Sequence, residues 1–128
     1  MRMQVLATAV VALAATGCQT WGPTWSEVTG IRYNRTIADR WSARVVAVGS
    51  ESVFSVPYKV APGTYTLAVE SPRHSGFAGT IQEMRLTIEP CKRYYINEQY
   101  ENFIQPKYTP VVDYVEGIAG CTVAVAAK

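Results

Sequence analysis

Short segments in which apolar and polar side chains alternate constrain the fold of this chain more than any other feature. In residues 80–89, Met84, Leu86 and Ile88 alternate with charged residues and threonine, and residues 64–70 repeat the pattern. A repeat of two residues places the apolar side chains on one face of a β-strand and the polar ones on the other. Few segments show the repeat of a helix, so the sequence predicts an all-β protein.

Turn-forming residues separate the candidate strands at intervals of about 8–12 residues, which is typical of β-sandwiches. We therefore expect a single antiparallel β-sandwich of about seven short strands. A small β-barrel is the alternative, because the number of strands does not distinguish the two architectures. Pro62 and Gly63 are predicted to form a type II turn. The candidate strands cover residues 28–33, 41–48, 53–56, 64–70, 80–89, 93–100, 108–115 and 122–125.

The N-terminal segment has the order of a secretory signal peptide. Arg2 gives it a positive start, residues 5–15 form an uncharged apolar run, and small residues lead to Cys18. The segment Thr16-Gly17-Cys18 resembles the end of the bacterial lipobox, which implies cleavage before Cys18 and attachment of lipid to that residue. A soluble secretory signal cut near Ala15 is the alternative. An uncleaved transmembrane anchor is disfavoured, because the run is shorter than the about 20 residues of a membrane span.

This resemblance sets the expected organisation of the chain. Residues 1–17 are the signal peptide, residues 18–26 the lipidated cysteine and a tether, and residues 27–128 the β-sandwich domain. Gln19 follows the cysteine where inner-membrane lipoproteins commonly carry Asp, which implies the outer membrane, with the domain facing the periplasm. Trp21 and Trp25 in the tether either lie at the membrane interface or pack on the domain.

The two remaining cysteines, Cys91 and Cys121, are predicted to form a disulfide, because an even pair in an oxidising compartment is normally bonded. Two buried free thiols are the alternative. No metal site is expected, because zinc needs about four ligands and the only histidine, His74, lies in a separate loop-like segment.

The charge balance excludes one class of partner. Loss of Arg2 with the signal leaves eleven basic residues, twelve minus one, against ten acidic ones. The mature protein is therefore nearly neutral and has no basic stripe, so no nucleic-acid partner is expected.

Two segments point to a family. Residues 56–69 resemble the V-x-PG-x-Y-x-L-x-V hairpin of transthyretin-like and PEGA-like β-sandwich domains. Residues 86–96 look like the strand–turn–strand segment of bacterial lipoproteins that carry such a domain. The resemblance implies an adhesion, surface-binding or assembly module of the cell envelope, and it carries over no catalytic residues.

Aromatic residues gather in the C-terminal third of the chain. Because only alternate residues of a strand face one side, Tyr94 and Tyr95 cannot both enter one core. Tyrosine suits contacts with peptides, proteins or glycans. The alternative is cross-strand pairing on the solvent face. The candidate binding surface consists of Tyr95, Tyr100, Phe103, Tyr108 and Tyr114.

The sequence gives only weak signals for a catalytic site. The pairs Glu98/Glu101 and Asp113/Glu116 could serve glycoside cleavage, but solvated strand-edge charges are favoured. His74 lies near two serines without the turn that presents a nucleophile. We therefore expect a non-enzymatic envelope lipoprotein without a cofactor, held to the membrane by lipid and binding an envelope protein or glycan. The alternatives are an inhibitor of a secreted hydrolase such as lysozyme and, third, a glycan hydrolase.

Overall fold

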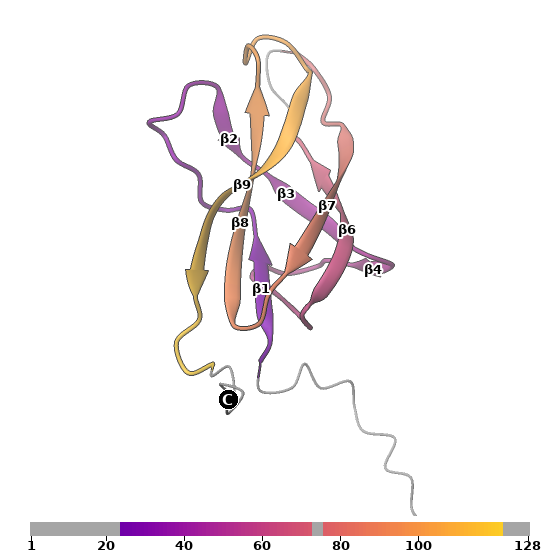
Figure 1. Cartoon of the computed structure of the whole chain (residues 1–128). Coiled ribbons are helices and arrows are strands. Elements are labelled where there is room, and N and C mark those ends of the chain that lie inside the picture. Colours follow the sequence, from indigo (N-terminus) through magenta and orange to yellow (C-terminus); the bar gives the residue numbers. More distant parts are fainter. Residues whose placement is uncertain (1–23, 73–75, 122–128) are drawn as a thin grey trace, which may run out of the picture.

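A computed structural model describes residues 24–72 and 76–121, which form two β-sheets packed face to face and contain no helix (Figure 1). The predicted β-sandwich is confirmed, and the two sheets do not close into one barrel. Within these residues the strands number nine rather than about seven. They are β1 (Ser26–Thr29), β2 (Arg40–Ser42), β3 (Arg44–Val48), β4 (Glu51–Ser52), β5 (Tyr58–Val60), β6 (Gly63–Glu70), β7 (Ile81–Ile88), β8 (Lys92–Tyr100) and β9 (Tyr108–Gly117).

The first sheet is organised around β8. β9 runs antiparallel along one edge of β8 for its whole length. The other edge is shared, because β1 pairs in parallel with residues 93–95 and β2 pairs antiparallel with residues 97–99. β5 completes the sheet beside β1. The predicted antiparallel arrangement thus holds for every described strand pair except β1 and β8, which lie far apart in the sequence.

The second sheet has the order β4-β3-β6-β7 and is wholly antiparallel. Two short segments carry the chain from the first sheet into the second. β2 and β3 are separated only by Ala43, and β5 and β6 only by residues 61–62. The hairpin expected around Pro62 and Gly63 is therefore wrong, because the strands on its two sides belong to different sheets. The φ of Gly63 is 155°, which is also far from the type II turn value of about +80°.

The core lies between the two sheets, where alternate residues of each strand meet. On β8, Tyr94 and Ile96 point inward, and the inward residues of β6 are Leu67 and Val69. The alternation in the sequence predicted these faces, since burial of apolar surface is the main driving force for packing two sheets. The remaining buried apolar members are Val28, Ala43, Val45, Val48, Val53, Val60 and Ile88.

Strand boundaries differ from the prediction mainly in the first half of the chain. β1 begins at Ser26, inside the range assigned to the tether, and the side chain of Ser26 is fully buried. Its hydroxyl donates to the carbonyl oxygen of Glu89 and accepts from the backbone N–H of Lys92. Phe54, expected on a strand, lies in a connection and is 94% exposed. The strand predicted at residues 122–125 lies outside the described residues.

The predicted disulfide between Cys91 and Cys121 is confirmed. It joins the turn that precedes β8 to the segment that follows β9, with the two Cα atoms 5.4 Å apart. Figure 1 shows both ends of the described chain at this end of the sandwich, and the connection between β1 and β2 projects from its side.

Candidate functional site

The five aromatic residues of the predicted binding surface divide between the interior and one flank of the first sheet. Tyr100 and Tyr108 are buried, at 1% and 2% exposure, and cannot contact a partner. The Tyr108 hydroxyl donates to the carbonyl oxygens of Val69 and Thr80, at 2.8 and 2.6 Å, and so ties β9 to the second sheet. These two tyrosines are direct partners across β8 and β9, and both lie on the face of the strand pair that meets the second sheet.

Tyr95 and Tyr114 lie on the opposite, outer face of the same strand pair. They are direct neighbours across β8 and β9, with ring centroids 6.1 Å apart. The guanidinium of Arg32 lies over both rings, 5.6 Å from Tyr95 and 5.8 Å from Tyr114. Tyr95 is buried beneath this cover, whereas Tyr114 is 51% exposed. Tyr94 and Tyr95 therefore point to opposite faces of β8, as the alternation predicts. Both are buried, Tyr94 in the core and Tyr95 beneath Arg32 on the outer face.

Phe103 belongs to a stack of aromatic rings that supports the connection between β1 and β2. Trp41 on β2 lies between Phe103 and Tyr33, with centroid distances of 4.3 and 5.6 Å and nearly parallel planes. Phe103 also meets the ring of Tyr100 edge to face. Arg35 lies over the Tyr33 ring at 5.6 Å. The stack therefore links the buried tyrosines to an exposed loop that carries two arginines.

Backbone hydrogen bonds fix both ends of this loop. At its start, the N–H of Ala43 donates to the carbonyl oxygen of Gly30. At its end, Asp39 accepts from the N–H of Tyr100 through its carbonyl and from the N–H of Phe103 through its carboxylate. Asn34 at the tip closes a local turn by accepting from the N–H and the hydroxyl of Thr36. The loop is thus held against β8 and β9.

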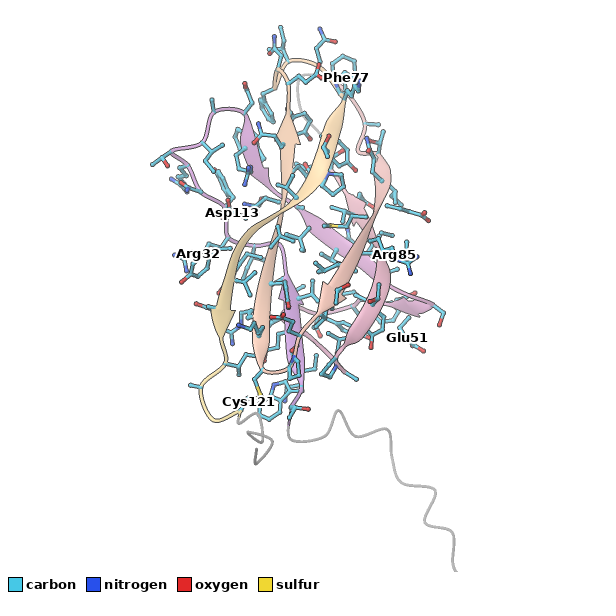
Figure 2. The ribbon with its side chains drawn as sticks, in the orientation of Figure 1. Arg32, Glu51, Phe77, Arg85, Asp113 and Cys121 are labelled. Atoms are coloured by element: carbon cyan, nitrogen blue, oxygen red, sulfur yellow. A yellow bond between two sulfur atoms is a disulfide. The ribbon has the colours of Figure 1, made fainter. Side chains whose placement is uncertain are left out.

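A cleft of about 330 Å³ separates this loop from β9. Figure 2 shows two of its residues, Arg32 and Asp113, close together on one flank of the sandwich. Asp113 is the extra residue of a bulge in β9, because Tyr95 pairs with Tyr114 and Ile96 already pairs with Val112. The lining residues are Arg32, Tyr33, Asn34, Arg35, Asp113 and Tyr114. We call this site the loop–β9 cleft.

Ion pairs beside the cleft already use most of the nearby carboxylates. Arg40 binds Asp113 at 2.6 Å, and both side chains are largely buried. Arg93 binds Glu27 at 2.7 Å and Glu116 at 2.8 Å. The Tyr95 hydroxyl donates to Glu116, and this bond, with the charge of Arg93, lowers the pKa of Glu116.

Arg32 and Arg35 differ from these two arginines. Neither forms an ion pair with any residue in 24–72 or 76–121. Both are exposed and lie over tyrosine rings, and the charge of Arg32 also contributes to the lowered pKa of Glu116. The loop–β9 cleft therefore has a net positive charge, because its one acid, Asp113, is neutralised by Arg40.

Neither carboxylate pair considered for glycoside cleavage contributes both of its members to the loop–β9 cleft. Glu98 is fully buried on the core face of β8, whereas Glu101 is exposed in the turn that follows. Of the four carboxylates, Asp113 alone lines the loop–β9 cleft. Burial raises the pKa of Glu98 to about 8, although a hydrogen bond from the Tyr100 hydroxyl opposes this change.

Other predicted features have mixed outcomes. His74 lies outside the described residues, as do Cys18 and Trp21. Trp25 packs on the domain, where the Lys59 ammonium lies 5.0 Å from its ring.

In the described ranges no three His, Cys, Asp or Glu side chains gather as a metal site would require. The same ranges contain no helix with the length and hydropathy needed to cross a bilayer.

Sequence reasoning missed the loop residues of the cleft. The sequence predicts a strand over residues 28–33, and this prediction gives Arg32 and Tyr33 no place in a binding site. A usable signal is present, since two arginines flank Tyr33 and Asn34 in the sequence Arg32-Tyr33-Asn34-Arg35. Comparison of the chain with protein-family models, with curated proteins and with solved structures gives no match.

Proposed function

We propose that this protein is a lipid-anchored lipoprotein of the bacterial envelope that binds a partner without catalysing a reaction. The observation that carries the binding role is the loop–β9 cleft. It places the half-exposed Tyr114 beside two arginines that form no ion pair within the described residues. Exposed aromatic and arginine side chains are the residue types that dominate binding energy at recognition sites.

The anchoring role rests on the signal-like N-terminus and on Cys18. Several acyl chains on one cysteine give stable membrane attachment, whereas one chain alone is marginal. The described chain starts at the disulfide end of the sandwich, and Figure 2 shows Arg32 and Asp113, which line the cleft, along its flank. This arrangement supports a domain that is fixed at one end and open to partners along its side. The proposed location is the outer membrane, with the domain facing the periplasm.

Metabolic labelling tests the anchor. Cells that express the protein are grown with a palmitate analogue, and the parent is compared with Cys18→Ser. We expect label and membrane fractionation for the parent, and loss of both for the variant. An unlabelled parent that fractionates like Cys18→Ser would show that the protein is not lipid-anchored.

Site-specific photocrosslinking in intact cells tests the binding role. A photoreactive amino acid replaces Tyr114 in one variant and Arg85 in a control variant. Arg85 is exposed on the second sheet, and Figure 2 shows it on the side away from Arg32 and Asp113. We expect adducts of defined size from position 114 and none from position 85. Equal adducts from both positions, or none from either, would contradict a binding role for the cleft.

A further inference from the structure

The way in which Arg32 and Arg35 are held leaves their hydrogen-bond donors available. Both guanidinium groups lie over tyrosine rings, at 5.6–5.8 Å from the ring centroids. A guanidinium carries five N–H donors in its own plane, and contact of its face with a ring uses none of them. The rings therefore position the arginines and leave their donors for a ligand that is itself an oxyanion.

The charge of the cleft favours the same kind of ligand. Asp113 is the only acid in the lining, and its bond to Arg40 at 2.6 Å cancels its charge. Glu27 and Glu116 are both bound to Arg93. Arg32, Arg35, Arg40 and Arg93 thus carry four positive charges against the three negative charges of these acids, which leaves one net positive charge beside the cleft. Arginine in such a setting binds carboxylate or phosphate groups in a bidentate manner.

Two further groups in the lining suit a sugar. Asn34 uses its amide oxygen to accept from Thr36, which leaves its NH₂ group as a donor toward hydroxyl groups. Tyr114 is 51% exposed as a residue, and an apolar face of a pyranose ring can pack on the exposed part of its side chain. The cleft, at about 330 Å³, is near the lower limit for small-molecule sites and has room for a short saccharide segment rather than a folded protein surface.

An extended peptide fits the neighbouring strand less well. Peptides commonly bind by adding a strand to an open sheet edge. β9 lies at such an edge, but it contains Pro110 and a bulge at Asp113. Proline removes a donor and a bulge interrupts the ladder, and both features block strand addition.

We propose that the loop–β9 cleft binds an acidic sugar unit of an envelope glycan, that is, a pyranose that carries a carboxylate or phosphate group. Arg32 and Arg35 bind the acidic group, Asn34 binds a hydroxyl group, and Tyr114 packs against the ring. This inference rests on the proposed binding function and names the ligand class of the same site.

Titration calorimetry on the full-length protein in detergent tests the proposal. The probes are an oligogalacturonate, its neutral methyl ester, glucose 6-phosphate, inorganic phosphate and triglutamate. We expect the acidic oligosaccharide or the sugar phosphate to bind, and esterification of the oligogalacturonate to weaken its binding at least about tenfold. Comparison of the affinities for oligogalacturonate and for glucose 6-phosphate shows whether the site prefers a carboxylate or a phosphate group. Equal binding of the ester, of phosphate alone or of triglutamate would overturn the sugar assignment.

Variants locate the binding. Arg32→Ala and Arg32→Lys should each weaken the acidic probe about tenfold or more, because lysine keeps the charge but loses the planar fork. Arg85→Ala removes the same charge from the opposite sheet and should leave affinity unchanged. Far-UV circular dichroism checks that each variant is folded. If no sugar binds while position 114 still gives crosslinks in cells, this inference fails and the proposed function stands.

Discussion

Glu98 shows how the position of one side chain on a strand sets its chemistry. It is fully buried on the core face of β8, and its Oε2 atom accepts from the Tyr100 hydroxyl at 2.9 Å. Its Oε1 atom has no hydrogen-bond partner. Burial favours the neutral carboxyl group, as does the nearby charge of Glu70, so the pKa rises from 4.5 to about 8. The acid therefore stays protonated in the folded protein near neutral pH.

A pH-dependent stability follows from this pKa. Between pH 4.5 and about 8 the unfolded chain has lost the Glu98 proton and the folded chain has kept it. The free energy of unfolding therefore falls as pH rises, by at most about 1.4 kcal/mol per pH unit. Glu98→Gln keeps a neutral side chain at every pH and should remove this slope. Urea unfolding at pH 4.5 and 8.5 should show the variant more stable than the parent at the higher pH only.

The control for this prediction is Glu83→Gln, which removes a carboxylate from an exposed position on β7. Its unfolding free energy should follow the parent at both pH values. If the unfolding free energy of Glu98→Gln changes with pH just as that of the parent does, Glu98 is already ionised in the folded protein.

At the scale of elements, the connections between the sheets determine the fold more than the strands themselves. β1 and the start of β3 are brought together where Gly30 meets Ala43. A Cβ atom at position 30 would lie 1.8 Å from the carbonyl oxygen of Ala43, which is far inside van der Waals contact. This glycine allows the backbone to pass from β2 to β3 beside β1, and it also begins the loop that forms the cleft.

Gly30→Ala should therefore destabilise the protein by more than about 2 kcal/mol, because the atoms in conflict belong to the backbone and cannot rotate away. The matched control is Gly117→Ala at the end of β9, where an added Cβ has no atom within 4 Å. That change should stay within about 0.5 kcal/mol of the parent. Urea unfolding measures the difference in stability between the two variants. Equal stability would show that the backbone near position 30 accommodates the added Cβ atom without loss of stability.

At the scale of the whole molecule, the disulfide holds together the end of the sandwich at which the described chain begins. Cys91 and Cys121 are separated by 30 residues, and the hairpin of β8 and β9 lies between them. Nearby, the N–H of Cys91 donates to the carbonyl oxygen of Thr24, just before β1. The cross-link therefore restrains the strand pair on which Tyr95 and Tyr114 lie.

Reduction of this disulfide should lower the free energy of unfolding by about 3–4 kcal/mol in the chain-entropy model for a loop of this length. Urea unfolding with and without dithiothreitol measures the difference. The double variant Cys91→Ser/Cys121→Ser should resemble the reduced parent and should not respond to the reductant. An unfolding midpoint of the parent that reductant leaves unchanged would contradict the prediction.

The sequence by itself determined the fold class, most of the longer strands and the disulfide. The strands β7, β8 and β9 lie within one or two residues of their predicted ranges, because alternation is a local pattern that burial of one face enforces. The prediction of a bond between Cys91 and Cys121 needed only a count of cysteines, the assignment of Cys18 to the lipid and the expectation of an oxidising compartment.

Only the tertiary structure decided which strands pair and which aromatic residues reach the surface. The parallel contact of β1 with β8 and the passage from β5 to β6 between sheets depend on residues far apart in the chain, and a local pattern does not encode such contacts. The same packing buried Tyr100 and Tyr108 and brought Arg32 from a loop onto Tyr114. The loop–β9 cleft exists only after the chain has folded, because its wall comes from two segments that are far apart in the sequence.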